Sequence, residues 1–277
     1  MTTAIYKEEH FAACDSLWTN DGGLVRRDIT EKKGITFNFK DSELVSFMAG
    51  NHVAIALMQA MQLSVITNEH YANLMTLYME HTDMQMSMVV FFKSTGEIDS
   101  RFGENLSRYM VKNRVVANTL GSSGGDFASE FLYFSSKRLR KKRRKKGNFA
   151  SSSGCNIVGA VNYAYTKDSA SGGKVFKIQW KDGQTVYSNI PLSNQHASER
   201  YKRQLKDTLV AIHSRYDKMK NKNLNQNQNQ NQNQNYMNTA AKQASSNSNK
   251  QVNANASSND VPLMTMSRVI NYAKIFS

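Results

Sequence analysis

Apolar residues recur at helical spacing through much of the first half of the chain. Asp41 fits the N-cap of a helix that runs to about Leu63, and a second helix begins near Thr67. The apolar face of this second helix follows the i, i+3, i+4, i+7 spacing: Tyr71, Leu74, Met75, Tyr78 and Met79. Residues 8–18 and 99–120 are predicted as two further helices. The N-terminal part is therefore predicted to be mainly helical.

Two stretches of this half favour strands. Residues 24–39 are predicted as a hairpin, because every second residue from Ile35 onwards is apolar. Residues 84–92 also alternate, and they fit either a strand or the end of a helix. After a glycine-rich break at 121–125, the helical spacing returns in three aromatic residues: Phe127, Phe131 and Phe134.

The period changes to two between residues 157 and 190, in three short runs that are predicted as antiparallel strands. Asp182-Gly183 joins the last two runs and is typical of a tight hairpin. A helix capped by Ser193 or Asn194 follows. Its apolar face is formed by Tyr201, Leu205, Leu209, Ile212 and Tyr216.

These patterns predict an α+β protein with a mainly helical N-terminal domain, then a small three-stranded antiparallel sheet plus helix. Five segments follow one another: an acidic α-rich domain for oligomerisation or partner binding (1–136), a basic arm and linker (137–153), a ββ-β-α module (154–222), a disordered Asn/Gln-rich linker (223–260) and a C-terminal amphipathic docking segment (261–277). The last segment either binds a protein partner or folds back onto its own domain. Its apolar face consists of Met266, Val269, Ile270, Ala273 and Phe276.

The distribution of charge changes this picture most. The chain of 277 residues has a net charge of +14. Residues 1–136 hold 11 basic and 16 acidic residues, whereas 137–146 hold nine basic residues and no acid. Such asymmetry indicates a polyanionic partner. We expect no signal peptide at Met1–Leu17 and no membrane span or membrane partner, because Leu44–Leu63 is too polar. The expected location is the cytoplasm or nucleoid, or the nucleus if the source is eukaryotic or a eukaryotic virus.

The basic run is the first part of a predicted nucleic-acid-binding site. Phosphate contacts from such a run give affinity that is independent of sequence and falls with salt. A nuclear localisation signal and a solvated charge run are the alternatives. The predicted phosphate-binding residues are Lys137, Arg138, Arg140, Lys141, Lys142, Arg143, Arg144, Lys145 and Lys146, with Arg200, Lys202, Arg203 and Lys206 at the start of the following helix.

The outward face of the predicted sheet supplies groups that bond or stack on bases. If the apolar residues of the strands face the helix, five others face outward: Lys177, Gln179, Thr185, Tyr187 and Asn189. In element order alone, this module resembles the three-strand-plus-helix DNA readers of AP2 and integrase type, which implies DNA binding through the sheet. The alternative is an ordinary half-exposed sheet with a polar solvent face.

Enzyme-like fragments do not assemble into a catalytic motif. Gly121–Asp126 lacks the Gly-Lys-Ser/Thr of a phosphate loop and has no positioned histidine, so a flexible break explains it better. Cys14 and Cys155 are interpreted as small buried groups. We therefore expect no enzyme, no cofactor and no metal. The predicted function is a DNA-binding protein in transcription, replication or packaging. An RNA-binding or nucleoprotein-coating protein, and a protein-interaction factor with a basic localisation signal, are the alternatives.

Overall fold

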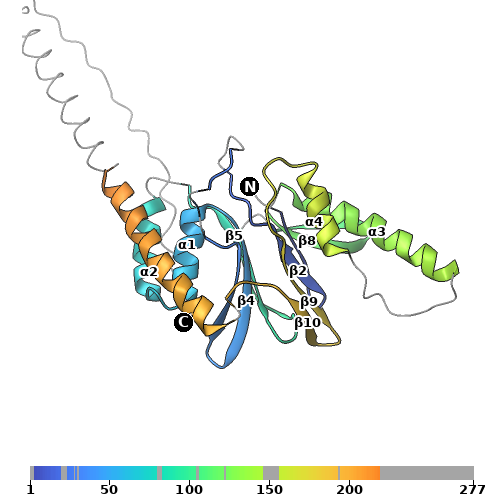
Figure 1. Ribbon diagram of the computed structural model, residues 1–277, viewed down its shortest axis with the longest axis horizontal. Coiled ribbons are helices and arrows are strands. Elements are labelled where there is room, and N and C mark those ends of the chain that lie inside the picture. Colours follow the sequence, from blue (N-terminus) through green and yellow to red (C-terminus); the bar gives the residue numbers. More distant parts are fainter. Residues whose placement is uncertain are drawn as a thin grey trace, which may run out of the picture.

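Two antiparallel β-sheets lie face to face between two layers of helices (Figure 1). The structure is a computed structural model that describes residues 3–19, 24–27, 29, 31–79, 83–103, 106–121, 123–145, 156–192 and 194–218. The larger sheet has the strand order β10-β9-β2-β1-β8-β7, and the smaller one the order β3-β4-β5-β6. Every strand pairs antiparallel with its neighbour in the sheet.

The first strand occupies a central place in the six-stranded sheet. It pairs with β2 on one side and with β8 on the other, so the start of the described chain is held by two neighbours. The strands of this sheet are β1 (Ala4–Lys7), β2 (Phe11–Cys14), β7 (Leu106–Val111), β8 (Arg114–Leu120), β9 (Phe176–Lys181) and β10 (Gln184–Ser188). The four-stranded sheet consists of β3 (Gly34–Phe39), β4 (Ser42–Gly50), β5 (Met86–Phe92) and β6 (Ile98–Phe102).

Helices cover the outer face of each sheet. The helices α1 (His52–Gln62) and α2 (Asn68–Met79), with the helical residues 195–218, pack on the four-stranded sheet. The helices α3 (Gly125–Lys145) and α4 (Ile157–Tyr165) pack on the six-stranded sheet. Among the described residues, no helix has the length and apolar character needed to cross a membrane.

The apolar core lies in three layers because the central strands are buried on both faces. In β4, Val45 and Phe47 face the other sheet, whereas Leu44 and Met48 face the helices. Strands of this kind are nearly continuously apolar, as β-strands with two covered faces usually are. The layer between the sheets includes the ring of Phe91, whose centroid lies within 6.3 Å of the ring centroids of Tyr6, Phe47 and Trp180.

The predicted helical N-terminal domain is wrong. Residues 8–18 contain β2, the first half of the helix predicted at 41–63 is β4, and residues 99–120 form β6, β7 and β8. The double burial of β4 explains its misassignment, because a strand that is apolar on both faces has the same local signature as a buried helix. The prediction of α2 is confirmed, and residues 86–92 are a strand. The hairpin predicted at 24–39 is wrong, because only its second strand forms, as β3, and this strand pairs with β4.

The predicted three-stranded sheet with a helix on it is also wrong. Ile157–Tyr165 is the helix α4, with Asn156 as its N-cap accepting from Gly159 N at 2.8 Å. The hairpin at Asp182-Gly183 is confirmed, but it extends the six-stranded sheet through β2. The helix at 195–218, capped by Asn194, packs on α1 and α2 instead. The likeness to integrase-type DNA readers therefore does not hold.

Several predicted segments fall outside the described residues. These are the linker part of 137–153 from residue 146 onwards, all of 223–260 and the docking segment 261–277. The boundaries of the five predicted segments stay predictions.

The core between the sheets predicts a large effect of shortening Phe91. Its side chain is fully buried, so Phe91→Ala should lower the free energy of unfolding by about 3–5 kcal/mol through lost burial and a cavity. Urea unfolding followed by circular dichroism measures this change. Phe134→Ala, at a side chain that is 50% exposed, is the matched control and should stay within about 0.5 kcal/mol of wild type. Equal losses in the two variants would contradict this core assignment.

Candidate active site

A lysine and an aspartate form a buried ion pair at the junction of the two sheets. Asp15 directly follows β2 and Lys33 directly precedes β3, so each residue belongs to a different sheet. The Lys33 Nζ atom lies 2.7 Å from Asp15 Oδ1, and the side chains are only 1% and 0% exposed. The same ammonium group donates to the Leu17 carbonyl oxygen and lies 5.2 Å from the centroid of the Trp18 ring.

The start of the chain binds to this pair. The Thr3 amide donates to Asp15 Oδ1 at 3.2 Å, and the Asp15 amide donates to the Thr3 carbonyl oxygen at 2.9 Å. The Gly172 amide donates to Asp15 Oδ2 at 2.9 Å. Both carboxylate oxygens therefore have donors, as a buried charge requires. The first described residue is fixed beside a buried cation.

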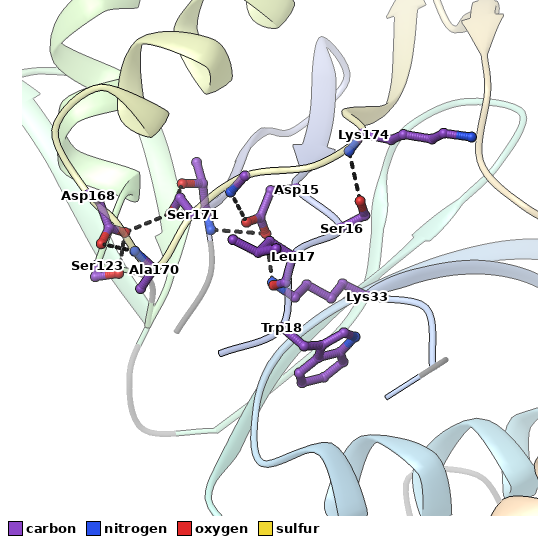
Figure 2. Close-up of polar contacts among 12 residues, drawn as sticks. Asp15, Ser16, Leu17, Trp18, Lys33, Ser123, Asp168, Ala170, Ser171 and Lys174 are labelled. Atoms are coloured by element: carbon purple, nitrogen blue, oxygen red, sulfur yellow. Dashed lines mark hydrogen bonds and ion pairs between the residues drawn. The ribbon is translucent and has the colours of Figure 1, made fainter. Parts of the chain in front are cut away.

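A row of hydrogen-bonded side chains connects Thr3 with Ser123, and Figure 2 shows its members Ser171, Asp168 and Ser123. Thr3 Oγ1 donates to Ser171 Oγ at 2.6 Å, and Ser171 Oγ donates to Asp168 Oδ2 at 2.6 Å. Ser123 Oγ donates to the same carboxylate oxygen at 2.5 Å. Thr3 is fully buried and Ser123 is exposed. The cluster thus connects the buried ion pair with solvent.

Hydrogen bonds keep the Asp168 carboxylate charged. Partial burial raises the pKa of Asp168, but donors from Ser123, Ser171 and the Ala170 amide outweigh burial and hold the pKa below its usual value. By contrast, burial and then the charge of Asp15 raise the pKa of the neighbouring Cys14 thiol. Because the thiolate is the reactive form of cysteine, this shift disfavours Cys14 as a nucleophile.

A metal centre is not evident in the described part of the chain. No group of three or more His, Cys, Asp or Glu side chains gathers there in a way that would hold an ion. The chemistry of the cluster is that of hydroxyl groups, one cation and two carboxylates.

The structure places the predicted base-reading residues on the β9–β10 hairpin. Lys177 Nζ lies 4.4 Å from the centroid of the Tyr187 ring and donates to Gln179 Oε1 at 2.9 Å, so these three residues do come together. Thr185 donates to the Lys93 carbonyl oxygen, and Asn189 Oδ1 accepts from the Lys177 amide at 2.7 Å. Base readout by this surface stays a prediction.

The predicted phosphate-binding residues lie on two helices. Lys137–Lys145 form the C-terminal part of α3, and Lys146 lies outside the described residues. Four others, Arg200, Lys202, Arg203 and Lys206, lie on the helix that packs on α1 and α2, not on the hairpin. Lys202 makes an ion pair with Glu199 at 2.9 Å. Phosphate binding by these residues also stays a prediction.

Sequence reasoning missed the residues of the candidate site. Its members are Thr3, Asp15, Lys33, Ser123, Asp168 and Ser171, and they come from five separate stretches of the chain. One signal lies in the sequence: the Gly121–Asp126 segment is rich in serine and glycine but has neither the Gly-Lys-Ser/Thr of a phosphate loop nor a positioned histidine. Ser123 and Gly124 of that segment prove to border the cluster. A lysine in place of the histidine was the alternative to consider.

The fold has two sheets between helical layers, and Thr3 lies in a hydroxyl-rich cluster at their junction. Among solved structures, three of the protein Anbu are similar to this chain. The helical assembly of the Anbu complex from Pseudomonas aeruginosa has 14% identity and a TM-score of 0.39, covering 78% of this chain and 96% of its own. Two structures from Hyphomicrobium sp. strain MC1 have 11% and 10% identity and TM-scores of 0.40 and 0.38. Each covers 77% of this chain and 97% of its own.

Scans against protein-family models and against curated protein sequences give no match. Because identity and TM-score are low, these likenesses decide neither family nor function. The function is therefore argued from the site itself.

The close approach at Gly124 predicts that a methyl group there disturbs the cluster. A Cβ atom at Gly124 would lie 2.0 Å from Thr3 Oγ1 and 2.7 Å from Ser171 Oγ. We expect Gly124→Ala to lower the free energy of unfolding by about 1–3 kcal/mol, the usual cost of overpacking. Gly34→Ala is the control, since its Cβ would make ordinary contacts at 3.4 Å or more. Denaturant unfolding compares the two, and an unperturbed Gly124→Ala variant would argue against this packing.

The lowered pKa of Asp168 predicts a pH-dependent stability. A carboxyl group whose pKa is lower in the folded state stabilises that state above its unfolded pKa, about 3.9, and loses this effect as pH falls through the folded pKa. Asp168→Asn should therefore be less stable than wild type at neutral pH, and the difference should shrink below about pH 4. Urea unfolding of both proteins between about pH 3 and pH 7 measures this difference in the free energy of unfolding. Asp182→Asn, at a carboxylate that is 86% exposed, is the control. Parallel curves for wild type and Asp168→Asn would refute the assignment.

Proposed function

We propose that the protein is a hydrolase of amide bonds whose nucleophile is an N-terminal threonine. The observation that carries this proposal is the buried Lys33–Asp15 pair, because the Thr3 amide shares Asp15 Oδ1 with the Lys33 ammonium group. Threonine nucleophiles use their own terminal amine as the general base, and lysine replaces histidine in several hydrolases. A buried cation at the start of the chain suits this chemistry.

Thr2 is the residue that we assign as the nucleophile. Thr3 is fully buried and its hydroxyl donates to Ser171, so that hydroxyl is already engaged. Thr2 is joined directly to the Thr3 amide, and one trans peptide unit spans only 3.8 Å between Cα atoms. Thr3, its neighbour in the chain, shares the Asp15 carboxylate with Lys33, and this contact supports the assignment. Cleavage of the Met1–Thr2 bond gives Thr2 the free amine that the reaction requires.

The proposed reaction has two stages. The Thr2 hydroxyl oxygen attacks the substrate carbonyl carbon while its proton passes to the Thr2 amine. The C–N bond of the substrate then breaks, the leaving nitrogen takes that proton, and an ester to Thr2 remains. Water attacks this ester with the amine again as base, which releases a carboxylic acid and restores the threonine. Lys33 stabilises the developing negative charge on the Thr2 oxygen.

The other polar residues have supporting roles in this proposal. Asp15 holds Lys33 in place and compensates its charge, and the Gly172 amide holds Asp15. Asp168, with Ser123 and Ser171, supplies acceptors close to the start of the chain, where a terminal amine needs to be oriented. These residues act through the nucleophile and its amine and do not themselves bond to the substrate.

This proposal departs from the prediction of a non-enzymatic DNA-binding protein. Nucleic-acid binding by the basic residues of α3 remains a second proposal, supported by the continuation of this long helix through eight cations in the nine residues 137–145. The two proposals concern different parts of the molecule. They also separate experimentally, since phosphate contacts weaken with salt and the hydrolytic reaction depends on Thr2.

The assay for the proposed function compares Thr2 variants in the full chain. Wild type should begin at Thr2 by intact-mass measurement, cleave members of a mixed peptide library and form a covalent adduct on Thr2 with an electrophilic peptide. Thr2→Ala should lower the cleavage rate by at least about 10³-fold, because the nucleophile is lost. Thr2→Ser should retain part of the activity, because a hydroxyl and an amine remain.

Thr2 is preferred to Lys33 for this test because removing one partner of a buried pair costs about 3–5 kcal/mol and would confuse misfolding with inactivity. Thr76→Ala, at an exposed position on α2, is the matched control and should leave cleavage unchanged. The proposal fails if protein with Thr2 at its N-terminus neither cleaves the library nor forms the adduct. It also fails if the Thr2→Ala variant cleaves as fast as wild type.

A further inference from the structure

The helix α2 and the helix at 195–218 lie on the side of the molecule away from the six-stranded sheet (Figure 1). An open apolar groove lies between them. Its volume is about 580 Å³, within the usual range for binding pockets. The apolar lining comes from Ile66, Leu74, Leu209 and Val210. Val210 is 70% exposed, so the wall of the groove offers an uncovered apolar side chain.

One end of the groove is polar and carries an acid. Tyr78 Oη lies 3.3 Å from His213 Nδ1, and His213 Nε2 lies 3.6 Å from Asp217 Oδ2. Lys218 lines the same end, so an acid and a base stand side by side there. An occupant with an apolar face and a few charged residues at its edge fits this lining.

The C-terminal segment of the same chain has this composition. In residues 261–277, the apolar residues recur at i, i+3, i+4, i+7 and i+10, in the order Met266, Val269, Ile270, Ala273 and Phe276. This spacing gives one apolar face to a helix of about three turns. The segment also contains Arg268 and Lys274 and has no acid after Asp260. An amphipathic helix in a groove between helices is a common mode of peptide recognition.

The connection between groove and segment favours docking within one chain. Lys218, the last described residue, itself lines the groove, so the connecting chain begins at the groove. The connecting residues 219–260 span roughly 35 Å on average if they behave as a flexible coil. A tether of this kind gives an effective concentration in the millimolar range, above that of a second copy at ordinary protein concentrations.

We propose that residues 261–277 form a helix that occupies the groove between α2 and the helix at 195–218 of the same chain. This proposal does not depend on the hydrolase proposal, because the groove and the candidate active site share no residue.

Hydrogen–deuterium exchange of the full-length protein tests this docking. We expect the amides of residues 261–277 to exchange about tenfold more slowly than in a free synthetic peptide of the same sequence, at low and high protein concentration alike. Val210→Glu should abolish the protection, because it places a charge on the apolar wall. Ile270→Glu should abolish it from the side of the segment.

Each variant has a matched control that adds the same charge nearby. Ala211 is exposed, is next to Val210 in the chain and does not line the groove, so Ala211→Glu is the control for Val210→Glu. Asn271 is not part of the apolar face of the segment, so Asn271→Glu is the control for Ile270→Glu. Both controls should keep the protection. Free-peptide exchange rates in wild type, or protection that survives Val210→Glu, would overturn the proposal. Protection that rises with protein concentration would also overturn it and assign the groove to the segment of a second copy.

Discussion

The contact between the Lys33 ammonium group and the Asp15 carboxylate is the constraint on which the candidate site depends. The two residues lie at the ends of strands in different sheets, so their contact fixes how the sheets meet at this edge. It also fixes the beginning of the chain, because Thr3 bonds to Asp15 through both its amide and its carbonyl group. The positions of the other polar residues follow from this anchor.

A buried ion pair is a poor source of stability, because desolvation of both charges offsets their attraction. The hydrogen-bond partners of the pair are therefore informative. The ammonium group binds Asp15 and the Leu17 carbonyl oxygen, and the carboxylate accepts from Thr3 and Gly172. A fold that needed only apolar packing at this point would be served by two apolar residues of similar volume. The retained charges and the hydroxyl row beside them support a chemical role.

The spacing of apolar residues and the turn residues predicted the elements that have one apolar and one polar face. α2 has one buried stripe, the strand from Ile35 alternates, and Asp182-Gly183 closes a hairpin, so each prediction was confirmed. Local signals failed where both faces of a strand are buried, as in β4, and where a strand depends on a distant partner, as in the pairing of β8 with β1. The site was missed for the second reason, since Asp15 and Gly172 are 157 positions apart.

The sequence by itself determined the periodicity of the one-sided elements, the turn at the β9–β10 hairpin, the charge asymmetry and the amphipathic spacing of the last residues. These are properties of neighbours in the chain, fixed by backbone geometry and composition. Only the tertiary structure decided that Thr3, Lys33, Asp168 and their partners form one cluster, and that the helix at 195–218 belongs to the other sheet. The cluster and the placement of this helix depend on the pairing of distant strands and on the burial of charged groups. The pattern of neighbouring residues in the sequence does not predict either of these.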